Sequence, residues 1–599
     1  MMLRTLILLI ALTMPTTAQP SIHYTLGMSH PSGHYLEVEM RITGLPSGDK
    51  TLDASMPAWR TGRYSIFDFV SGVVDVAASD GSGDKLSYHK TDKQTWRIDK
   101  GRSTTVVVTY RVYANEFNMR TRGLNDEHAF VDPAAVFMYV SSLKNRPLTI
   151  EVKPYGAWKV TTGLDAVRGK TNVFGAPTYE YFADCPIEVG NQKEFTFDVD
   201  GVPHVWMIAG EGNYDIDRII EDTKKLVLAN KKMWGRLPYQ RYIFMLHLSP
   251  TSGGGTEHIN STIMGTRPFG FTTPGSYRGF LGLVSHEYFH TWNVKQLRPA
   301  GITPYDFSQE NYTRELWVAE GTTSFYTGII MLRAGIGTAD EYIGRLASEI
   351  KDERQRPGNR KQSVAEASFD AWVKYWKGTP QAYNEESDYY DQGSNVSMAL
   401  NLEILKRSQG KAGLDDVLRA MFERFPVGKN GYTIEDLQKV SEEKGGGSFA
   451  EFFTKHVTGS EDFAWEELFA AAGLEVKATP ETKPSLGVRM NDSEGRVRVW
   501  GVQAGTAGDA AGLTQGDEIV AFNGYRARSQ EVSARVSEMK PGESAAMTIF
   551  RDEKLLTITV RPFIPTVPNY TVKKVEKPTD VQKAIYEKWL GVKWEEKKE

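Results

Sequence analysis

The sequence predicts a multidomain fold, with an N-terminal all-β domain, a central α+β domain and a further small domain near the C-terminus. At 599 residues the chain has the length of about three or four domains. Alternating apolar and polar residues, as in 35–40 and 104–110, recur over residues 19–203 between turn-forming clusters and are typical of β-strands. From residue 204 the apolar spacing becomes helical, as in 214–234, which predicts a largely helical domain over 204–480.

The start of the chain has the features of an export signal. Arg4 precedes a short apolar run over residues 6–12, and Thr16-Thr17-Ala18 has the small residues of a cleavage site. We therefore expect residues 1–18 to be a signal peptide, cleaved near Ala18, and the protein to be periplasmic or secreted. The apolar run is too short to span a bilayer, so no transmembrane segment is expected. An uncleaved, membrane-associated N-terminus is the alternative.

The composition argues against several classes of partner. A formal net charge of −4 gives no basis for binding nucleic acid or an acidic membrane surface. The hydrophobic content of 40% and the aromatic content of 11% fit globular domains with sizeable cores. Cys185 is the single cysteine, so no disulfide forms within the chain, and we expect it to be a small core residue.

The central domain contains two histidines four residues apart, in His286-Glu287-Tyr288-Phe289-His290. On a helix, residues four apart share a face, so two neutral imidazoles there can bind one zinc ion. Glu287 lies beside such a metal rather than on it, where it can take a proton from a bound water molecule. For this pentapeptide alone, two half-buried core histidines are the alternative.

A zinc hydrolase of this type needs a third protein ligand. The helix-like stretch 314–333 contains two acids, Glu315 and Glu320. Five residues turn a helix by about 140°, so both acids cannot face the same metal. A buried carboxylate without a partner is costly, and a metal removes that cost. These arguments leave Glu315 and Glu320 as rivals; we take Glu320 as the third ligand because Gly321 follows it, a pair that the resemblance described next explains.

Two segments, HEYFHTWNVKQLRP (286–299) and LWVAEGTTSFY (316–326), together resemble the M61 glycyl aminopeptidase family. M61 belongs to the gluzincins, which are thermolysin-like zinc peptidases with a glutamate on a second helix as third ligand; the aminopeptidase N family is a neighbour. The resemblance implies that the two histidines and Glu320 bind one Zn²⁺ and that Glu287 is the general base. It also implies a thermolysin-like fold for the central domain and a preference for N-terminal glycine or alanine.

A glycine-rich segment, Gly253-Gly254-Gly255-Thr256-Glu257-His258, is similar to the Gly-x-Met-Glu-Asn segment of aminopeptidase N. Glycines let a substrate backbone lie against an edge strand. The resemblance implies that Gly254 and Gly255 line the cleft and that Glu257 binds the free α-amine of a peptide, with His258 in the place of asparagine. Peptides with a free N-terminus are therefore the expected substrates. An ordinary glycine-rich loop is the alternative.

The segment Tyr389-Tyr390-Asp391-Gln392-Gly393 precedes a helical stretch over 395–405 and is similar to the Tyr-x-Lys-Gly motif of aminopeptidase N. Gln392 stands where that motif has lysine. The resemblance implies that Tyr390 donates a hydrogen bond to the oxyanion of the reaction, a contribution of about 2.7–4 kcal/mol for one such donor. Tyr389 is the second choice, and a packing tyrosine at the start of a helix is the alternative.

Residues 484–565 resemble a PDZ domain, most clearly over AGLTQGDEIVAFNG (511–524). The resemblance implies that backbone N–H groups of Leu486, Gly487 and Val488 hold the terminal carboxylate of a peptide, which adds to the domain as an extra strand. A domain that only packs on its neighbour is the alternative. M61 proteins often carry such a domain.

Two further segments receive structural interpretations. Residues 57–64, PAWRTGRY, resemble part of the M61 N-terminal domain, and we expect a structural turn without a catalytic role. Residues 566–599 are rich in Lys and Glu, and we expect a charged helical tail in which 580–590 form one amphipathic helix.

These features together predict an exported zinc metallo-aminopeptidase that removes small N-terminal residues. Zinc activates water, Glu287 is the base, Tyr390 stabilises the oxyanion and Glu257 holds the amino terminus. A zinc endopeptidase on the same fold is the first alternative, and it predicts that N-acetylated peptides are still cleaved. A non-catalytic adaptor that binds peptides through its PDZ domain is the second, and it predicts that Glu287→Gln has no effect.

Overall fold

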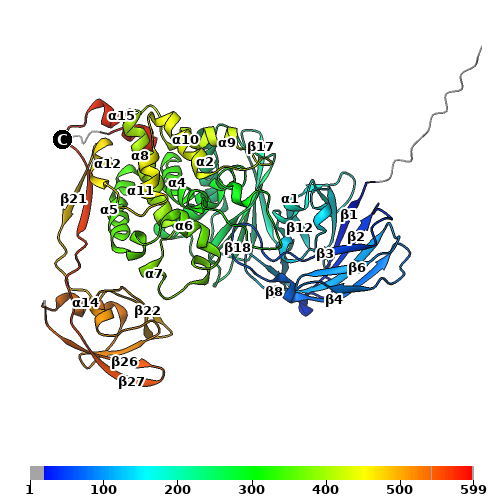
Figure 1. The fold of residues 1–599 in the computed structure, drawn as a ribbon, viewed down its shortest axis with the longest axis horizontal. Coiled ribbons are helices and arrows are strands. Elements are labelled where there is room, and N and C mark those ends of the chain that lie inside the picture. The colour runs from blue at the N-terminus through cyan, green and yellow to red at the C-terminus, as the bar shows by residue number, and fades with distance from the viewer. Residues whose placement is uncertain (1–18, 541, 596–599) are drawn as a thin grey trace, which may run out of the picture. The chain divides into compact units, whose positions relative to one another are not determined.

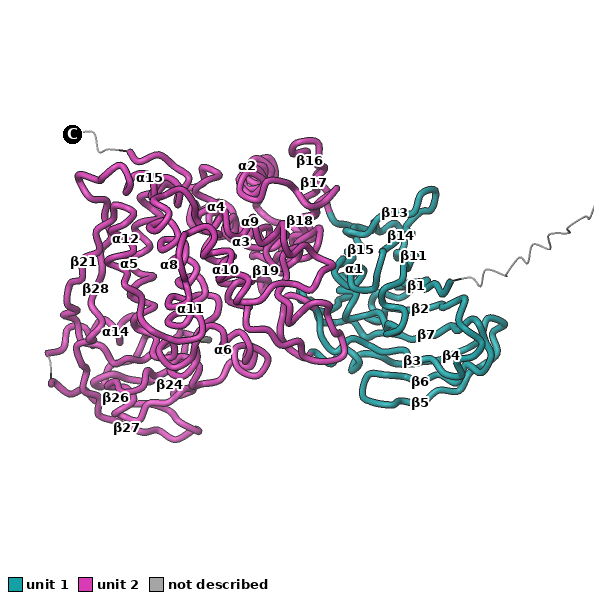
Figure 2. Tube along the Cα trace, turned by 45° about the horizontal axis from the view of Figure 1, so that its top comes forward, with its two compact units in different colours: residues 1–60, 67–192 teal, residues 61–66, 193–599 magenta. Residues whose placement is uncertain are grey.

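The computed structural model describes residues 19–540 and 542–595. The expected signal peptide, residues 1–18, lies outside this range, as do the last four residues of the charged tail. The chain forms two compact units, one of residues 1–60 and 67–192 and one of residues 61–66 and 193–599 (Figure 2). No helix among the described residues is both long enough and apolar enough to cross a membrane.

The first unit is built of β-sheets, as the alternating sequence pattern predicts. In β2, for example, Leu36, Val38, Met40 and Ile42 are buried while the residues between them are partly exposed. Its seven-stranded sheet has the order β13-β14-β11-β1-β2-β7-β4, with β1 and β11 parallel. These strands are β1 (Ser21–Gly27), β2 (Tyr35–Thr43), β4 (Val73–Asp80), β7 (Val106–Tyr113), β11 (Leu148–Lys153), β13 (Asp165–Ala166) and β14 (Val173–Ala176).

Two smaller sheets, one short α-helix and several short 3₁₀ turns make up the rest of the described part of the first unit. The five-stranded sheet has the order β12-β15-β10-β9-β8, and the three-stranded sheet has the order β3-β6-β5. Their strands are β3 (Thr51–Ser55), β5 (Tyr88–Lys90), β6 (Thr95–Asp99), β8 (Asn115–Glu116), β9 (Arg122–Leu124), β10 (His128–Val131), β12 (Lys159–Thr162) and β15 (Ile187–Gly190); the helix is α1 (Tyr179–Ala183). Cys185 follows α1 and is buried, as expected.

The second unit begins with a five-stranded sheet of order β16-β17-β18-β20-β19. Its strands are β16 (Lys193–Val199), β17 (Val202–Ala209), β18 (Tyr242–Leu248), β19 (Gly254–Glu257) and β20 (Ser261–Thr266). The expected domain boundary at residue 203 therefore falls inside β17 and is wrong by about ten residues, because β16 pairs with β17 and both belong to this sheet. The strand β19 is antiparallel to β20 and forms the edge of the sheet.

Helices make up most of the rest of this unit (Figure 1). They are α2 (Ile216–Trp234), α3 (Pro274–Phe289), the π-helical η6 (Trp317–Thr322), α4 (Thr323–Arg333), α5 (Ala339–Gln355), α6 (Val364–Phe369), α7 (Ala382–Glu385), α8 (Asp391–Arg407), α9 (Leu414–Arg424), α10 (Ile434–Gly445), α11 (Ala450–His456) and α12 (Trp465–Ala471). In α2, Asp215 accepts a hydrogen bond from the N–H of Arg218 at the start, and Gly235 takes φ +92° at the end. The helix expected over 214–234 is thus confirmed.

The domain expected over 484–565 has its own β-sheet and core. The path β22-β23-β24-β26-β27 leaves β22 at one edge. Its elements are β22 (Val488–Ser493), β23 (Arg496–Val502), α13 (Ala507–Ala510), β24 (Glu518–Phe522), β25 (Tyr525–Arg526), α14 (Ser529–Glu538), β26 (Ala545–Arg551) and β27 (Lys554–Val560). Buried residues such as Val499, Ile519, Val532 and Met547 form its core.

The chain after this domain is more than a charged tail. Strand β28 (Asn569–Lys574) pairs with β21 (Leu474–Thr479), and the two strands form an antiparallel ribbon (Figure 1). Helix α15 (Asp580–Leu590) has the expected bounds, and its Trp589 and Leu590 are buried. The Trp589 carbonyl accepts a hydrogen bond from Arg333 at the end of α4. The C-terminal segment therefore returns to the central helices and completes their core.

Candidate active site

Helix α3 carries the two histidines at its last turn. Thr273 caps its start by accepting a hydrogen bond from the N–H of Ser276, and Pro274 occupies the first turn, where its missing N–H costs nothing. Buried residues concentrate in the second half of the helix, and His290, which caps its end, lies one turn from His286 on the same face. The expected helical context of the motif is confirmed.

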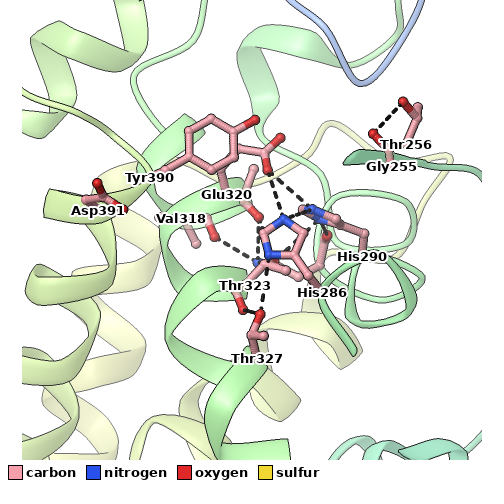
Figure 3. A network of polar contacts seen from close by, with 12 residues as sticks. Gly255, Thr256, His286, His290, Val318, Glu320, Thr323, Thr327, Tyr390 and Asp391 are labelled. Carbon is pink, nitrogen blue, oxygen red and sulfur yellow. Dashed lines mark hydrogen bonds and ion pairs between the residues drawn. The ribbon is translucent and has the colours of Figure 1, made fainter. Parts of the chain in front are cut away.

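Glu320 meets the two imidazoles from η6 (Figure 3). The distances are 3.2 Å from His290 Nε2 to a Glu320 carboxylate oxygen, 3.8 Å from His286 Nε2 to the same oxygen, and 3.2 Å between the two Nε2 atoms. In a tetrahedral zinc site with bonds of about 2.0–2.1 Å, neighbouring ligand atoms are about 3.3 Å apart. The three side chains therefore fit as the protein ligands of one zinc ion, and a catalytic zinc also binds a water molecule.

Hydrogen bonds on the other side of each ring orient the imidazoles. His290 Nδ1 lies 3.0 Å from the Asn293 carbonyl oxygen, which can only accept, so this nitrogen carries the proton. His286 Nδ1 lies 3.3 Å from the Thr327 hydroxyl. The two Nε2 atoms lie on the opposite side of the rings from these hydrogen bonds and are 3.2 Å apart, where both can face one metal ion.

Burial and neighbouring charges shift the pKa values of the cluster. Burial opposes ionisation of Glu320, but His290 and His286 outweigh it and lower the pKa of this carboxyl to about 2. Burial lowers the pKa of His286. Glu320 outweighs burial at His290 and raises the pKa of this imidazole to about 9, so an ionised carboxylate lies beside one charged and one neutral ring. A metal ion would take the place of the His290 proton, and carboxylate and imidazole groups are ligands that zinc binds.

The position after Glu320 has room only for glycine. A Cβ at Gly321 would lie 2.5 Å from the Cα of Gly393 in α8, so these two glycines let the backbones of η6 and α8 touch. The contact brings Tyr390, which immediately precedes α8, to the metal cluster. Glu315, the rival ligand, is elsewhere: its carboxylate accepts hydrogen bonds from the N–H groups of Arg314 and Ile434.

Glu287 lies between the metal cluster and the edge strand. One ligand atom each of Glu257, Glu287 and His290 lie within 4.8 Å of one another, and all three side chains are buried. A Cβ at Gly255 would lie 2.5 Å from the Glu287 carboxyl carbon, so β19 can pass the carboxylate only because this residue is glycine. Gly254, at φ +84°, has open space around it.

Of the two candidate tyrosines, Tyr390 is the one that reaches the cluster. Its ring lies 6.5 Å from the His286 ring, and Figure 3 shows it beside the imidazoles while Asp391 points away. Burial and then the charge of Glu320 raise its pKa well above the usual value, so its hydroxyl keeps its proton. Tyr389 is fully buried against Tyr375, and its hydroxyl has no hydrogen-bond partner among the described residues.

The segment Thr61–Ile66 also reaches this site, although its sequence suggested only a turn. It belongs to the second unit, and a Cβ at Gly62 would lie 2.8 Å from a Glu257 carboxylate oxygen. Tyr64 is buried, and burial, Glu320 and Glu257 together raise its pKa well above the usual value. Residues 61 and 62 form a turn, as expected, and this turn lies against Glu257, which the sequence did not indicate. Gly62 takes a positive φ of +81° in this turn. The sequence does not show this, because a Thr-Gly pair alone does not fix the backbone conformation.

The loop expected to bind a peptide carboxylate precedes β22. Gly487 takes φ +68°, and the Leu486 carbonyl accepts a hydrogen bond from the N–H of Gly508. Gly487, Val488 and Arg489 are part of the lining of a cavity of about 720 Å³. The Arg489 guanidinium lies over the ring of Trp500, at 4.2 Å from its centroid.

Three family models match the chain. Residues 23–191 match the Peptidase M61 N-terminal domain, residues 279–396 match M61 glycyl aminopeptidase, and residues 484–561 match the PDZ domain. The second match includes every residue of the metal cluster together with Glu287 and Tyr390.

The chain is also similar to individual proteins. Among solved structures, an aminopeptidase N family protein from Idiomarina loihiensis is 25% identical, with a TM-score of 0.88 over 94% of this chain and 100% of that chain. A curated relative, a probable periplasmic serine endoprotease DegP-like protein from Rhizobium meliloti (strain 1021), is 33% identical over 100 residues. The chain spans only 19% of that relative's length, so the second likeness concerns a small part of both proteins.

Proposed function

We propose that this chain, which belongs to the M61 peptidase family, is a zinc aminopeptidase that removes one N-terminal residue at a time from peptides. The observation that carries the proposal is the spacing of 3.2–3.8 Å among three ligand atoms, with two further carboxylates, Glu287 and Glu257, buried beside them. In this arrangement the two histidines and Glu320 can bind a metal, Glu287 can transfer a proton, and Glu257 can bind an amine.

His286, His290 and Glu320 hold the metal in this proposal. When zinc is bound there, it polarises the scissile carbonyl and lets water act as a nucleophile near neutral pH. Asn293 and Thr327 keep the two imidazoles in the tautomer that offers Nε2. The π-helical turn of η6 presents the Glu320 carboxylate at the same point, as is frequent for such turns at functional sites.

Glu287 moves the proton. It accepts a proton from the attacking water and later delivers it to the nitrogen of the departing peptide. Its burial beside Gly255 keeps the carboxylate close to the edge strand, where the scissile bond lies if the substrate backbone follows β19.

Tyr390 stabilises the oxyanion. Its raised pKa keeps the hydroxyl protonated, so it donates a hydrogen bond to the oxygen on which negative charge develops. Tyr389 cannot take this role in the same conformation because it is fully buried against Tyr375.

Glu257 sets the number of residues removed. Its carboxylate lies within 4.8 Å of ligand atoms of both Glu287 and His290. The α-amine of a peptide is two bonds from the first carbonyl carbon, so an amine held by Glu257 puts the first peptide bond at the metal. Each further residue would add about 3.3–3.6 Å, which this spacing does not accommodate. Family resemblance adds the preference for glycine or alanine.

The test is a panel of aminoacyl and N-acetylated peptides, each assayed with and without a chelator. We expect cleavage of the first bond only, dependence on a free amine, and loss of activity with the chelator that zinc restores. Cleavage of N-acetylated peptides at the same rate would instead identify an endopeptidase. Activity that survives complete removal of metal would contradict the zinc proposal.

A second function, peptide binding at the PDZ domain, is favoured by the open edge of β22 and the arginine beside the loop of Gly487. We expect N-acetylated peptides with a free C-terminal carboxylate to bind more tightly than their amides in a fluorescence anisotropy titration. Arg489→Gln should weaken this difference, whereas Arg498→Gln, an exposed arginine of β23, should not. Equal binding of acids and amides would mean that the loop holds no carboxylate.

We further propose that the protein is exported. If residues 1–18 are a signal peptide, N-terminal sequencing of the protein recovered from its native cells will start at Gln19. Recovery of the intact N-terminus would contradict it.

A further inference from the structure

Gly62 lies directly against the carboxylate of Glu257. An added Cβ would be 2.8 and 2.9 Å from the two carboxylate oxygens and 3.1 Å from the carboxyl carbon. Distances under about 3 Å force one of the two groups to move. Gly62 also has φ +81°, a conformation that is strained for other residues. The position therefore excludes a side chain for two separate reasons, and only one of them involves Glu257.

The backbone around Gly62 is held on both sides. Before it, the Thr61 hydroxyl accepts a hydrogen bond from the ammonium of Lys295, a buried residue in the loop that follows His290. After it, Arg63 lies over the ring of Trp376, at 4.5 Å from its centroid. Gly62 therefore cannot withdraw easily from the site.

Tyr64 fixes the segment further. It is buried and packs edge-on against Trp372, with ring centroids 5.8 Å apart. An added methyl group at residue 62 would thus be relieved by Glu257, since a carboxylate at the end of a flexible side chain moves at lower cost than a backbone held at three points.

From this geometry we propose that Gly62 is a positioning residue for the amine site: its bare Cα holds the Glu257 carboxylate where it selects peptides with a free N-terminus. This inference rests on the proposed aminopeptidase function. The carboxylate is confined between Gly62 on one side and the Glu287 and His290 groups, which lie within 4.8 Å, on another. Confinement matters because a charge-assisted hydrogen bond to an ammonium depends strongly on distance and direction.

The measured quantity is the amine preference, defined as kcat/KM for a free-amine peptide divided by kcat/KM for its N-acetylated form. Gly62→Ala should lower this preference about tenfold to a hundredfold, mainly through a higher KM for the free-amine peptide, because the ion pair is misplaced. Cleavage of the N-acetylated peptide should change little, as it does not use the ion pair.

Gly335→Ala is the matched control. Gly335 has a similar φ of +74°, a Cβ there would have no neighbour within 4 Å, and it lies after α4 away from the residues of the site. Both variants carry the cost of a left-handed alanine, so both should lose similar thermal stability. A merely structural effect of Gly62→Ala would be shared by Gly335→Ala, whereas a change in amine preference would not.

A double-mutant cycle with Glu257→Asp tests the contact itself. Aspartate is one methylene shorter, which withdraws the carboxylate and leaves room for the new Cβ. We expect Gly62→Ala to lower the amine preference in the glutamate background and to have little further effect in the aspartate background. Equal losses in both backgrounds, or no loss in either, would overturn the proposal. If the wild-type protein has no amine preference, the aminopeptidase function itself fails instead.

Discussion

The metal end and the amine end of the site are built in different ways. At the metal end, His286 and His290 come from one helical turn, and hydrogen bonds to the Asn293 carbonyl oxygen and the Thr327 hydroxyl orient their rings. At the proposed amine end, Glu257 comes from an edge strand and its carboxylate lies against Gly62, a residue with no side chain. The metal end thus depends on side chains that orient its ligands, whereas the amine end depends on the missing side chain of Gly62.

Because of this difference, we expect the metal end to control the rate of bond cleavage and the amine end to control which peptides bind. Variants at the metal end should change kcat or metal content, because they act on the bond that breaks. Variants at the amine end should change the KM of peptides with a free amine and leave the metal in place.

The largest effect is expected from Glu287→Gln. Loss of the general base should lower kcat about 10²–10⁴-fold, while zinc content, measured by elemental analysis, stays at one ion per chain. Glu221→Gln, at an exposed position of α2, is the control and should match the wild type. Activity retained by Glu287→Gln would favour a non-catalytic or differently catalysed function.

Tyr390→Phe should have the next largest effect. Loss of one oxyanion donor lowers kcat about 10²–10³-fold, with little change in KM. Tyr389→Phe is a matched control, because it removes a buried hydroxyl that has no hydrogen-bond partner among the described residues and should leave kcat near the wild-type value. The reverse order of the two variants would assign the oxyanion role to Tyr389.

Glu257→Gln should change only the preference for peptides with a free amine. Replacing the charged partner of the ammonium should reduce kcat/KM for free-amine peptides about tenfold to a hundredfold, with zinc content unchanged and N-acetylated peptides little affected. A loss of zinc from this variant would show that the two ends are not separate.

Thr327→Val should have the smallest effect on turnover. It removes the hydroxyl next to His286 Nδ1, and loss of such a partner typically weakens metal binding about 10–100-fold. We expect a lower zinc affinity in a competition titration and near-normal kcat when zinc is in excess. Thr322→Val, which removes a hydroxyl bonded to Ser397 instead, is the control. Equal zinc affinity in both variants would show that the Thr327 hydroxyl does not contribute to metal binding.

The metal end could be predicted from the sequence because its parts follow local rules. Histidines four apart share a helix face, and only one of Glu315 and Glu320 can point at the same metal. The structure brings Glu320 to the histidines and ties Glu315 to the N–H of Ile434. The sequence did not show that η6 is π-helical or that Gly321 touches Gly393, because both depend on packing between helices that are distant in the chain.

The amine end could be predicted only in part. Gly255 and Glu257 were recognised from a resemblance, but the role of Gly62 depends on a tertiary contact with a segment about two hundred residues earlier. The boundary at residue 203 was misplaced for a related reason. Strand pairing, rather than local composition, assigns β16 and β17 to the second unit and ties β28 to β21.

The most direct test is a crystal structure of the zinc-loaded protein, with anomalous scattering measured at the zinc absorption edge. We predict one peak about 2.0–2.2 Å from His286 Nε2, His290 Nε2 and a Glu320 carboxylate oxygen, with Glu257 against Gly62 and not in contact with the metal. A peak between Glu257, Glu287 and His290, or no zinc bound at Glu320, would contradict the account.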